Sequence, residues 1–219
     1  MSRAAPDLSE DRRRGLSLVP VSRETEADFE SLVGLLTRWQ AVKNLVGPAT
    51  LPEVWTRHIA DSAQLLALAP GALRWLDLGS GAGFPGLVIA IMLKGRDGAH
   101  VTLVEANGRK CAFLREAARV LKLPATVLNA RIEDAVPRIG TPVDVVTARA
   151  LAPLTTLLGW SEKLLTTGAL GLFPKGQDVE AELTESAKCW RIQASIAASI
   201  TNPEAGIVIV HSLEPRIVS

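Results

Sequence analysis

A short apolar segment that runs into a glycine-rich loop is the feature that most constrains the fold of this chain. Residues 75–78 read Trp-Leu-Asp-Leu, and Gly79, Gly81 and Gly83 follow at alternate positions before the apolar run 87–93. A buried strand that turns through such a loop into a helix is how α/β sheets bind nucleotide-like ligands at their carboxyl edge. We therefore expect a ligand site at this loop.

The chain beyond the loop alternates between strand and helix patterns. Strands are expected near residues 101–105, 126–128, 143–147, 169–173, 193–200 and 207–211, and helices near 85–93, 109–121, 154–165 and 178–188. Strand–helix alternation is typical of a parallel sheet with helices on both faces, which makes this an α/β protein. Together with the strand before the loop, seven strands are expected in a mostly parallel sheet.

Two amphipathic helices are expected ahead of the loop. Ser22 can cap the first, in which apolar residues recur every three or four positions, and the second starts near Thr50. Residues 1–20 contain three consecutive arginines and are expected to form a mobile arm, either a solvated tail or a segment that touches phosphate. The expected organisation is an arm at 1–20, a helical extension at 21–71 and one α/β domain at 72–219.

Composition and charge narrow the class of protein. The net charge of +1 over 219 residues means that any nucleic-acid contact must come from a local patch. No apolar run reaches the ~18 residues of a membrane span, so we expect a cytoplasmic protein without a membrane segment. Cys111 and Cys189 have no paired spacing and the three histidines are scattered, so no metal site is expected.

Details of the loop distinguish between nucleotide ligands. Residues 81–86 formally satisfy G-x-G-x-x-G, which permits a nicotinamide cofactor, but Phe84 occupies the third dinucleotide position when the motif is read from Gly79. Asp77 would repel a pyrophosphate and attract the amino group of a methionine moiety, and Glu105 after the second strand could accept hydrogen bonds from a ribose diol. The pattern is similar to the first motif of S-adenosylmethionine (SAM) methyltransferases, in which Asp77, the three glycines, Phe84 and Glu105 would bind the cofactor.

The residues after the fourth strand limit which chemical group could accept the methyl group. Methylation of pyrimidine carbon 5 needs a nucleophilic cysteine, and this chain has no cysteine at a strand end. Methylation of exocyclic amines typically uses the motif Asn/Asp-Pro-Pro-aromatic after the fourth strand, where this chain has Thr-Ala-Arg-Ala at 147–150. Neither reaction is therefore expected. An acceptor that needs little activation, such as N7 of guanine, fits, because catalysis can then be mainly orientation of the base. Arg149 could bind the cofactor or the guanine edge, or form a structural pair with a carboxylate.

A set of short motifs resembles one family in order and spacing. The motifs are Asn44-Leu45, the run from Arg57 to Ser62, the loop from Asp77 to Gly86, Arg131-Ile132-Glu133, Arg149-Ala150 and Lys175-Gly176-Gln177. From about Glu24 to the C-terminus the chain resembles the bacterial guanine-N7 methyltransferases of small-subunit ribosomal RNA, also called the glucose-inhibited division protein B family. The resemblance implies a Rossmann-like class I SAM methyltransferase fold with an N-terminal helical extension.

The resemblance also implies a substrate and site residues. The substrate would be guanine 527 of 16S rRNA, in the small ribosomal subunit or an assembly intermediate, and the enzyme is expected to be a monomer. Gly79, Phe84, Ile132, Glu133 and Arg149 would contact the cofactor, with residues 132–133 near the adenine.

Basic residues in three places are candidates for RNA contact. Arg115, Arg119 and Lys122 are spaced to share one face of the expected helix. This face is either a phosphate-binding stripe or an ordinary solvated face. Lys175 follows the fifth strand at the carboxyl edge, where a substrate should lie. Arg57 and His58 belong to the second helix, and His58 either stacks on a base or makes a packing contact.

Three other functions remain open from the sequence. A SAM methyltransferase of a small molecule would transfer the methyl group without RNA. A catalytically silent RNA- or nucleotide-binding protein would bind without turnover, although the intact Asp77 and glycines argue against it. A nicotinamide-dependent dehydrogenase is a more distant alternative that a cofactor titration would reveal.

Overall fold

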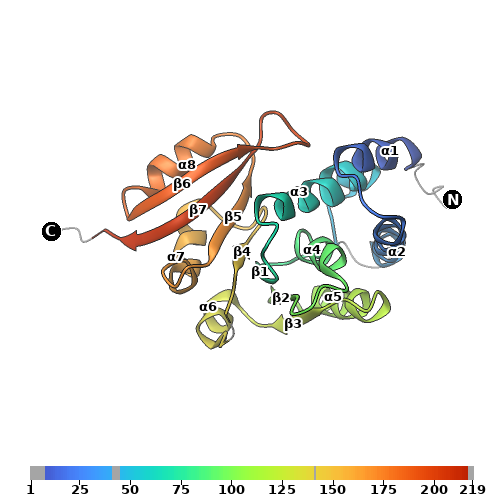
Figure 1. The fold of residues 1–219 in the computed structure, drawn as a ribbon, viewed down its shortest axis with the longest axis horizontal. Coiled ribbons are helices and arrows are strands. Elements are labelled where there is room, and N and C mark those ends of the chain that lie inside the picture. The colour runs from blue at the N-terminus through green and yellow to red at the C-terminus, as the bar shows by residue number, and fades with distance from the viewer. Residues whose placement is uncertain (1–7, 41–44, 141, 217–219) are drawn as a thin grey trace.

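The structure is a computed structural model that describes residues 8–40, 45–140 and 142–216. Its centre is a seven-stranded sheet of order β3-β2-β1-β4-β5-β7-β6 (Figure 1). The strands are β1 Arg74–Leu78, β2 His100–Glu105, β3 Ala125–Asn129, β4 Val145–Thr147, β5 Leu170–Lys175, β6 Trp190–Ala198 and β7 Gly206–Pro215. Only β7 pairs antiparallel to its neighbours within the described sheet. This confirms the predicted α/β fold with a mostly parallel seven-stranded sheet.

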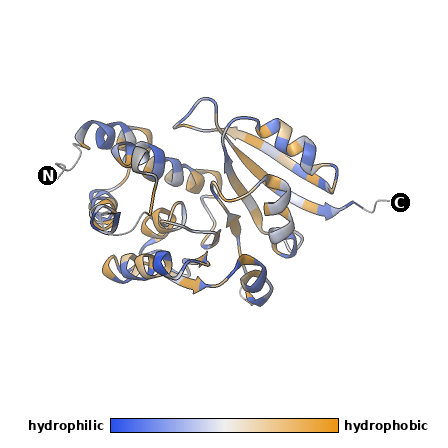
Figure 2. Ribbon diagram, turned by 180° about the vertical axis from the view of Figure 1, so that it is seen from behind, coloured by the Kyte–Doolittle hydropathy of each residue, from blue (hydrophilic) through white to orange (hydrophobic). Residues whose placement is uncertain are grey.

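Helices cover both faces of the sheet. The helices after the glycine loop are α4 Gly86–Leu93, α5 Gly108–Val120, α6 Ile132–Ala135, α7 Leu154–Leu165 and α8 Val179–Ser186. Figure 1 shows α4 and α5 on one side of the sheet, and α6 and α7 on the other side. The helix α8 contacts α7 and packs on the same cluster of buried residues. The buried apolar residues accordingly form two clusters, one on each face. Figure 2 shows hydrophobic residues along the strands and on the helix sides that face them.

The N-terminal helices explain why α4 is apolar on all sides. Such a helix must be covered on more than one side, because its exposed face would otherwise carry polar residues. The extension consists of α1 Ser9–Leu18, α2 Arg23–Gln40, a 3₁₀ segment η1 Pro48–Glu53, a π-helical segment η2 Trp55–Ala60 and α3 Asp61–Leu68. Both α2 and α3 contact α4. The extension therefore completes the core on one face of the sheet.

The second predicted helix of the extension is irregular. The sequence favours a helix from about Thr50, whereas the structure has a 3₁₀ segment there, then the π-helical η2, and an α-helix only from Asp61. The first helix agrees better, since the Ser22 hydroxyl accepts a hydrogen bond from the Thr25 N–H at 3.2 Å, as expected of a cap. A π-helical turn inside a helix is frequently found at functional sites, and η2 carries Arg57 and His58.

The segment 9–18 differs from the expected arm, because it forms α1 and packs on η2. The Asp11 carboxylate accepts hydrogen bonds from the N–H groups of Trp55 and Thr56, at 2.7 and 3.2 Å, and from the Thr56 hydroxyl at 2.6 Å. Gly15 lies so close that a Cβ there would be 2.8 Å from the Trp55 carbonyl oxygen. Residues 1–7 of the expected arm lie outside the described part of the chain.

Removal of the Asp11 carboxylate is expected to destabilise the protein. Asp11 satisfies N–H donors at the start of η2, so Asp11→Ala should lower the free energy of unfolding by roughly 1–2 kcal/mol. The neighbouring Glu10 is exposed in the same helix turn, so Glu10→Ala is the matched control and should change stability by less than about 0.5 kcal/mol. Urea unfolding of both variants measures the difference, and equal midpoints would contradict the capping role of Asp11.

Candidate cofactor and substrate site

The glycine loop joins β1 to α4 in a conformation that requires glycine. Gly79 and Gly81 have φ angles of +64° and +56°, in the left-handed region that residues with a side chain rarely adopt. A Cβ on Gly79 would also lie 2.6 Å from the Leu151 side chain. The Ser80 N–H donates to the Val104 carbonyl at 2.9 Å, which ties the loop to β2. The loop therefore lies at the carboxyl edge of the sheet, where Gly79 and Gly81 are half-buried.

Asp77 lies behind the loop rather than in the cavity above it, which corrects the expectation that its carboxylate faces the ligand. The side chain is 1 % exposed, and its Oδ2 accepts a hydrogen bond from the Gly86 N–H at 3.1 Å. A Cβ on Gly86 would be 2.6 Å from Oδ2, so the glycine permits this close approach. Oδ1 has no hydrogen-bond partner among the described residues. Asp77 therefore holds the first turn of α4 against β1.

Burial of Asp77 has a consequence for the pH dependence of stability. Desolvation raises the pKa of Asp77 from 3.8 to about 7. The folded state then binds the proton more tightly than the unfolded state, so stability falls as pH rises from about 4 to about 7.

Asp77→Asn is expected to remove this pH dependence, because asparagine has no proton to lose. Between pH 5 and pH 7 the wild-type protein should lose roughly 2 kcal/mol more stability than the variant does. Urea unfolding at the two pH values measures both slopes. Parallel slopes for the two proteins would show that Asp77 does not titrate in this range.

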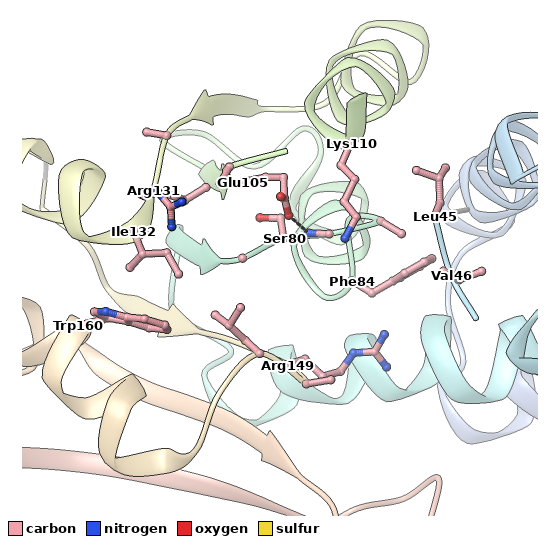
Figure 3. Close-up of a pocket in the computed structure, with 18 of the residues that line it drawn as sticks. Leu45, Val46, Ser80, Phe84, Glu105, Lys110, Arg131, Ile132, Arg149 and Trp160 are labelled. Atoms are coloured by element: carbon pink, nitrogen blue, oxygen red, sulfur yellow. Dashed lines mark hydrogen bonds between the residues drawn. The ribbon is translucent and has the colours of Figure 1, made fainter. Parts of the chain in front are cut away.

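A cavity of about 490 Å³ opens above the glycine loop (Figure 3). This volume lies in the usual range for a small-molecule site. Its wall includes the loop itself, the end of β2, the start of α6, the segment that follows β4 and one side chain of α7. The cavity contains most of the predicted cofactor residues, namely Gly79, Gly81, Phe84, Glu105, Ile132, Glu133 and Arg149. Gly83 does not line it, because this glycine faces the side chains of Leu87 and Leu114 between α4 and α5.

Glu105 presents a fixed carboxylate to this cavity. Its Oε2 accepts the Gly81 N–H at 2.8 Å, the bond drawn in Figure 3, and its Oε1 accepts the Asn107 N–H at 2.7 Å. Each carboxylate oxygen can accept a further hydrogen bond, so the pair suits the two hydroxyls of a ribose. The residues present therefore fit a nucleoside ligand, as the sequence predicts for Glu105.

Trp160 is a cavity residue that sequence reasoning missed. It lies on α7, and Figure 3 shows its indole beside Ile132 at the cavity wall. With Leu151 these side chains form an apolar surface suited to a flat aromatic ring. No motif contains Trp160, and its place in the wall depends on how α7 packs on the sheet.

Arg149 connects the end of β4 to the N-terminal extension. One guanidinium nitrogen donates to the Arg57 carbonyl at 2.8 Å and to Asp61 Oδ2 at 3.0 Å, and the other donates to His58 Nδ1 at 2.7 Å. The guanidinium carbon also lies 5.8 Å from the centre of the Phe84 ring. Arg149 thus forms the structural carboxylate pair considered above and also lines the cavity above the glycine loop.

His58 is held as a neutral, packed side chain. Burial, with the charges of Arg149 and Arg57, lowers the pKa of His58 to about 3. Because arginine can only donate, Nδ1 is the acceptor, and Nε2–H then donates to the Thr50 hydroxyl at 3.1 Å. One ring face stacks on Phe84 with centroids 4.8 Å apart. These contacts support the packing role of His58 over stacking on a base.

A second cavity of about 1050 Å³ lies on the other side of Arg149. The two cavities share Arg149, Ala150 and Leu151, so a ligand in one can approach a ligand in the other. The second cavity is lined by α1, η2, the connection from β4 to α7, the end of β5 and the segment between β6 and β7. A large cavity beside the first, with charged side chains in a mixed polar and apolar wall, is suited to a second substrate.

Two of the basic residues predicted to contact RNA, Arg57 and Lys175, line the second cavity. Lys175 lines the second cavity, as expected from its strand-end position, but its ammonium already donates to Glu182 at 2.7 Å and to the Ala152 carbonyl at 2.8 Å. Arg57 also lines this cavity, and its exposed guanidinium lies 3.4 Å from Glu53. The motif residue Asn44 lies outside the described residues.

The predicted basic stripe on α5 does not reach either cavity. Arg115 and Arg119 are absent from the described walls of both, and Arg119 pairs with Glu116 at 3.0 Å. The helix ends at Val120, and Lys122 lies beyond it with a φ of 53°, so it does not continue the stripe. The Arg119–Glu116 pair fits an ordinary solvated face, and the phosphate-binding stripe stays a prediction.

Two further features of the described residues bear on the class of site. Residues 8–40, 45–140 and 142–216 contain no group of three His, Cys, Asp or Glu side chains able to hold a metal ion. Within the same ranges, no helix combines the length and the apolar character that crossing a bilayer requires. Cys111 is buried and Cys189 exposed, and both are free thiols.

Comparisons with known proteins give the chain a family context. The family described as rRNA small subunit methyltransferase G matches residues 25–208. A protein of Methylorubrum populi named ribosomal RNA small subunit methyltransferase G is 59% identical to this chain, over 92% of this chain and 95% of that protein. A protein of the same name from Rhodopseudomonas palustris strain HaA2 is 55% identical, over 94% of this chain and 86% of that protein. A crystal structure of the O-methyltransferase from Bacillus cereus in complex with SAH has a TM-score of 0.60 at 15% identity, over 94% of this chain and 98% of that one, which shows a shared fold.

Proposed function

The chain belongs to the rRNA small subunit methyltransferase G family, a family of SAM-dependent methyltransferases, and from that premise we propose that it methylates N7 of one guanine in 16S rRNA. The target implied by the family resemblance is guanine 527. The observation that carries the proposal is the pair of neighbouring cavities that share Arg149, since methyl transfer needs a donor site and an acceptor site in contact.

The smaller cavity suits SAM. We assign the ribose to Glu105, the adenine to the apolar surface of Ile132 and Trp160, and the methionine part to the backbone of Gly79 and Gly81. When bound, SAM supplies an electrophilic methyl group on a sulfonium. The chain's own residues bind and orient it, and Arg149 closes the wall toward the second cavity.

The second cavity supports an acceptor that loses no proton on attack. Its three described carboxylates each pair with a cation, and His58 uses both ring nitrogens in hydrogen bonds. The side chains of this cavity wall that could act as a general base are therefore engaged. N7 of guanine has a free lone pair, so it needs orientation rather than deprotonation, whereas an exocyclic amine must lose a proton.

The proposed substrate is the small ribosomal subunit or an assembly intermediate, with a single chain as the catalytic unit. The size of the second cavity favours a nucleotide of a larger RNA over a small metabolite, although both substrates are tested in the same experiment.

Transfer of a labelled methyl group tests the proposal. The protein is incubated with methyl-labelled SAM and with 16S rRNA, small subunits or precursor particles from cells that lack the gene. Label is expected in 16S rRNA from these cells and not in rRNA from wild-type cells, in which the target is already methylated. Absence of label from every RNA substrate, under conditions where SAM binds, would contradict the proposal and favour a small-molecule acceptor or a silent binding protein.

A further inference from the structure

The wall of the second cavity carries one more cation than its carboxylates neutralise. Three of its cations pair with three of its carboxylates, at N–O distances of 3.4, 3.0 and 2.7 Å; these pairs are Arg57–Glu53, Arg149–Asp61 and Lys175–Glu182. Arg14 of α1 lines the same cavity. Across the described part of the chain, no carboxylate lies within ion-pair distance of the Arg14 guanidinium. The excess positive charge of this cavity is therefore that of Arg14.

The three consecutive arginines of α1 lie in different environments. Arg12 pairs with Glu26 and Glu30 of α2 and lies over the Trp55 ring, 5.7 Å from its centre, so it holds α1 in place. Arg13 is exposed and is not part of the described wall of the second cavity, because successive helix residues point about 100° apart. Arg14 alone of the three lines the cavity.

The position of Arg14 is fixed by the attachment of α1 to η2. Asp11 caps η2, and Gly15 packs on the Trp55 backbone, so the residues on both sides of Arg14 are anchored. The same segment η2 carries Arg57 and His58 of the cavity wall. An anchored helix places the Arg14 guanidinium at the cavity rim without the need to order a mobile arm.

We propose that Arg14 binds a backbone phosphate of the rRNA next to the target guanine. A guanidinium without a carboxylate partner offers several N–H donors and a full charge, which match phosphate oxygens. A base that enters the second cavity brings its own phosphate to the rim, where Arg14 supplies the unpaired charge. The inference rests on the proposed function. It adds a contact from α1, which precedes the residues 25–208 that match the family.

Substitution of neighbouring arginines tests the proposal. Arg14→Gln and Arg13→Gln remove the same charge from adjacent positions of one helix, so Arg13→Gln is the matched control, and Arg14→Lys retains the charge. Binding of a 16S rRNA fragment that contains the target is measured at several salt concentrations, with SAM affinity as a second readout. Arg14→Gln should weaken RNA binding roughly tenfold, since one phosphate contact is lost. The salt slope, which is the slope of the logarithm of RNA affinity against the logarithm of salt concentration, should become shallower by about one counterion. Arg13→Gln should stay within about twofold of wild type, and Arg14→Lys should retain the salt slope.

The outcomes separate this inference from the proposed function. Equal RNA affinity of Arg14→Gln and Arg13→Gln, while the wild type still methylates rRNA, would overturn the role of Arg14 and leave the function intact. An equal loss of SAM and RNA affinity in Arg14→Gln would assign Arg14 a structural role and also overturn it. A wild type that binds SAM but neither binds nor methylates the rRNA would overturn the function, and this inference with it.

Discussion

Gly79→Asp is expected to weaken SAM binding by at least roughly a hundredfold, which corresponds to about 2.7 kcal/mol. Gly79 lines the proposed SAM cavity with a φ of +64°, and any side chain there meets Leu151. Aspartate tolerates the left-handed region better than most residues, so the chain should still fold. Its carboxylate, however, would occupy the space that we propose for the methionine part of SAM and would repel the carboxylate of that ligand.

A second glycine provides the control for backbone strain. Gly95 also has a positive φ, of +81°, but a Cβ there meets nothing within 4 Å, and the residue is exposed. Gly95→Asp should therefore leave SAM affinity within about twofold of wild type. Isothermal titration calorimetry compares the two variants with the wild type. Wild-type affinity in Gly79→Asp would show that the glycine loop is not the cofactor site.

Arg149→Ala is expected to lower the turnover number at least roughly a hundredfold, because Arg149 lines both cavities and its loss displaces the two sites relative to each other. The change also leaves Asp61 Oδ2 and His58 Nδ1 without a donor, so the segment after β4 is no longer tied to η2 and α3. Single-turnover methylation of rRNA measures the effect on transfer, and SAM binding measured alongside it separates transfer from cofactor affinity.

Two further variants decide what Arg149 contributes. Arg149→Lys keeps the charge but not the forked donors that reach three partners, so it should recover only part of the activity. Arg119→Ala removes an exposed arginine that pairs with Glu116 away from both cavities and should leave turnover unchanged. An unchanged turnover number in Arg149→Ala would return this residue to a purely structural ion pair.

The regular part of the fold could be predicted from sequence because its signals are local. The strand before the loop, the helix of 154–165 and the alternation that follows depend on short runs of residues, and the structure has α7 at Leu154–Leu165. The helix α1 could not be predicted in the same way. Asp11 caps a segment 44 residues further along the chain, and such a contact has no local pattern.

The site could be located from sequence more reliably than its contacts could be assigned. Strand-end residues such as Glu105 and Lys175 lie at the expected edge, because parallel strands bring their carboxyl ends together. The partners of those side chains depend on packing, as when Glu182 of α8 meets Lys175. The burial of Asp77 depends on Gly86, nine residues later in the chain. The absence of a Cβ at Gly86 lets the Asp77 carboxylate approach α4.

The position and chemistry of the added methyl group test the central claim most directly. After incubation with SAM, 16S rRNA from cells that lack the gene is reduced with borohydride and treated with aniline, which cleaves the chain at N7-methylguanosine. We predict one new cleavage, at guanine 527, that is absent without SAM and absent with the Gly79→Asp variant. Labelled 16S rRNA without this cleavage, or with the methyl group on another nucleoside, would contradict guanine-N7 methylation by this protein.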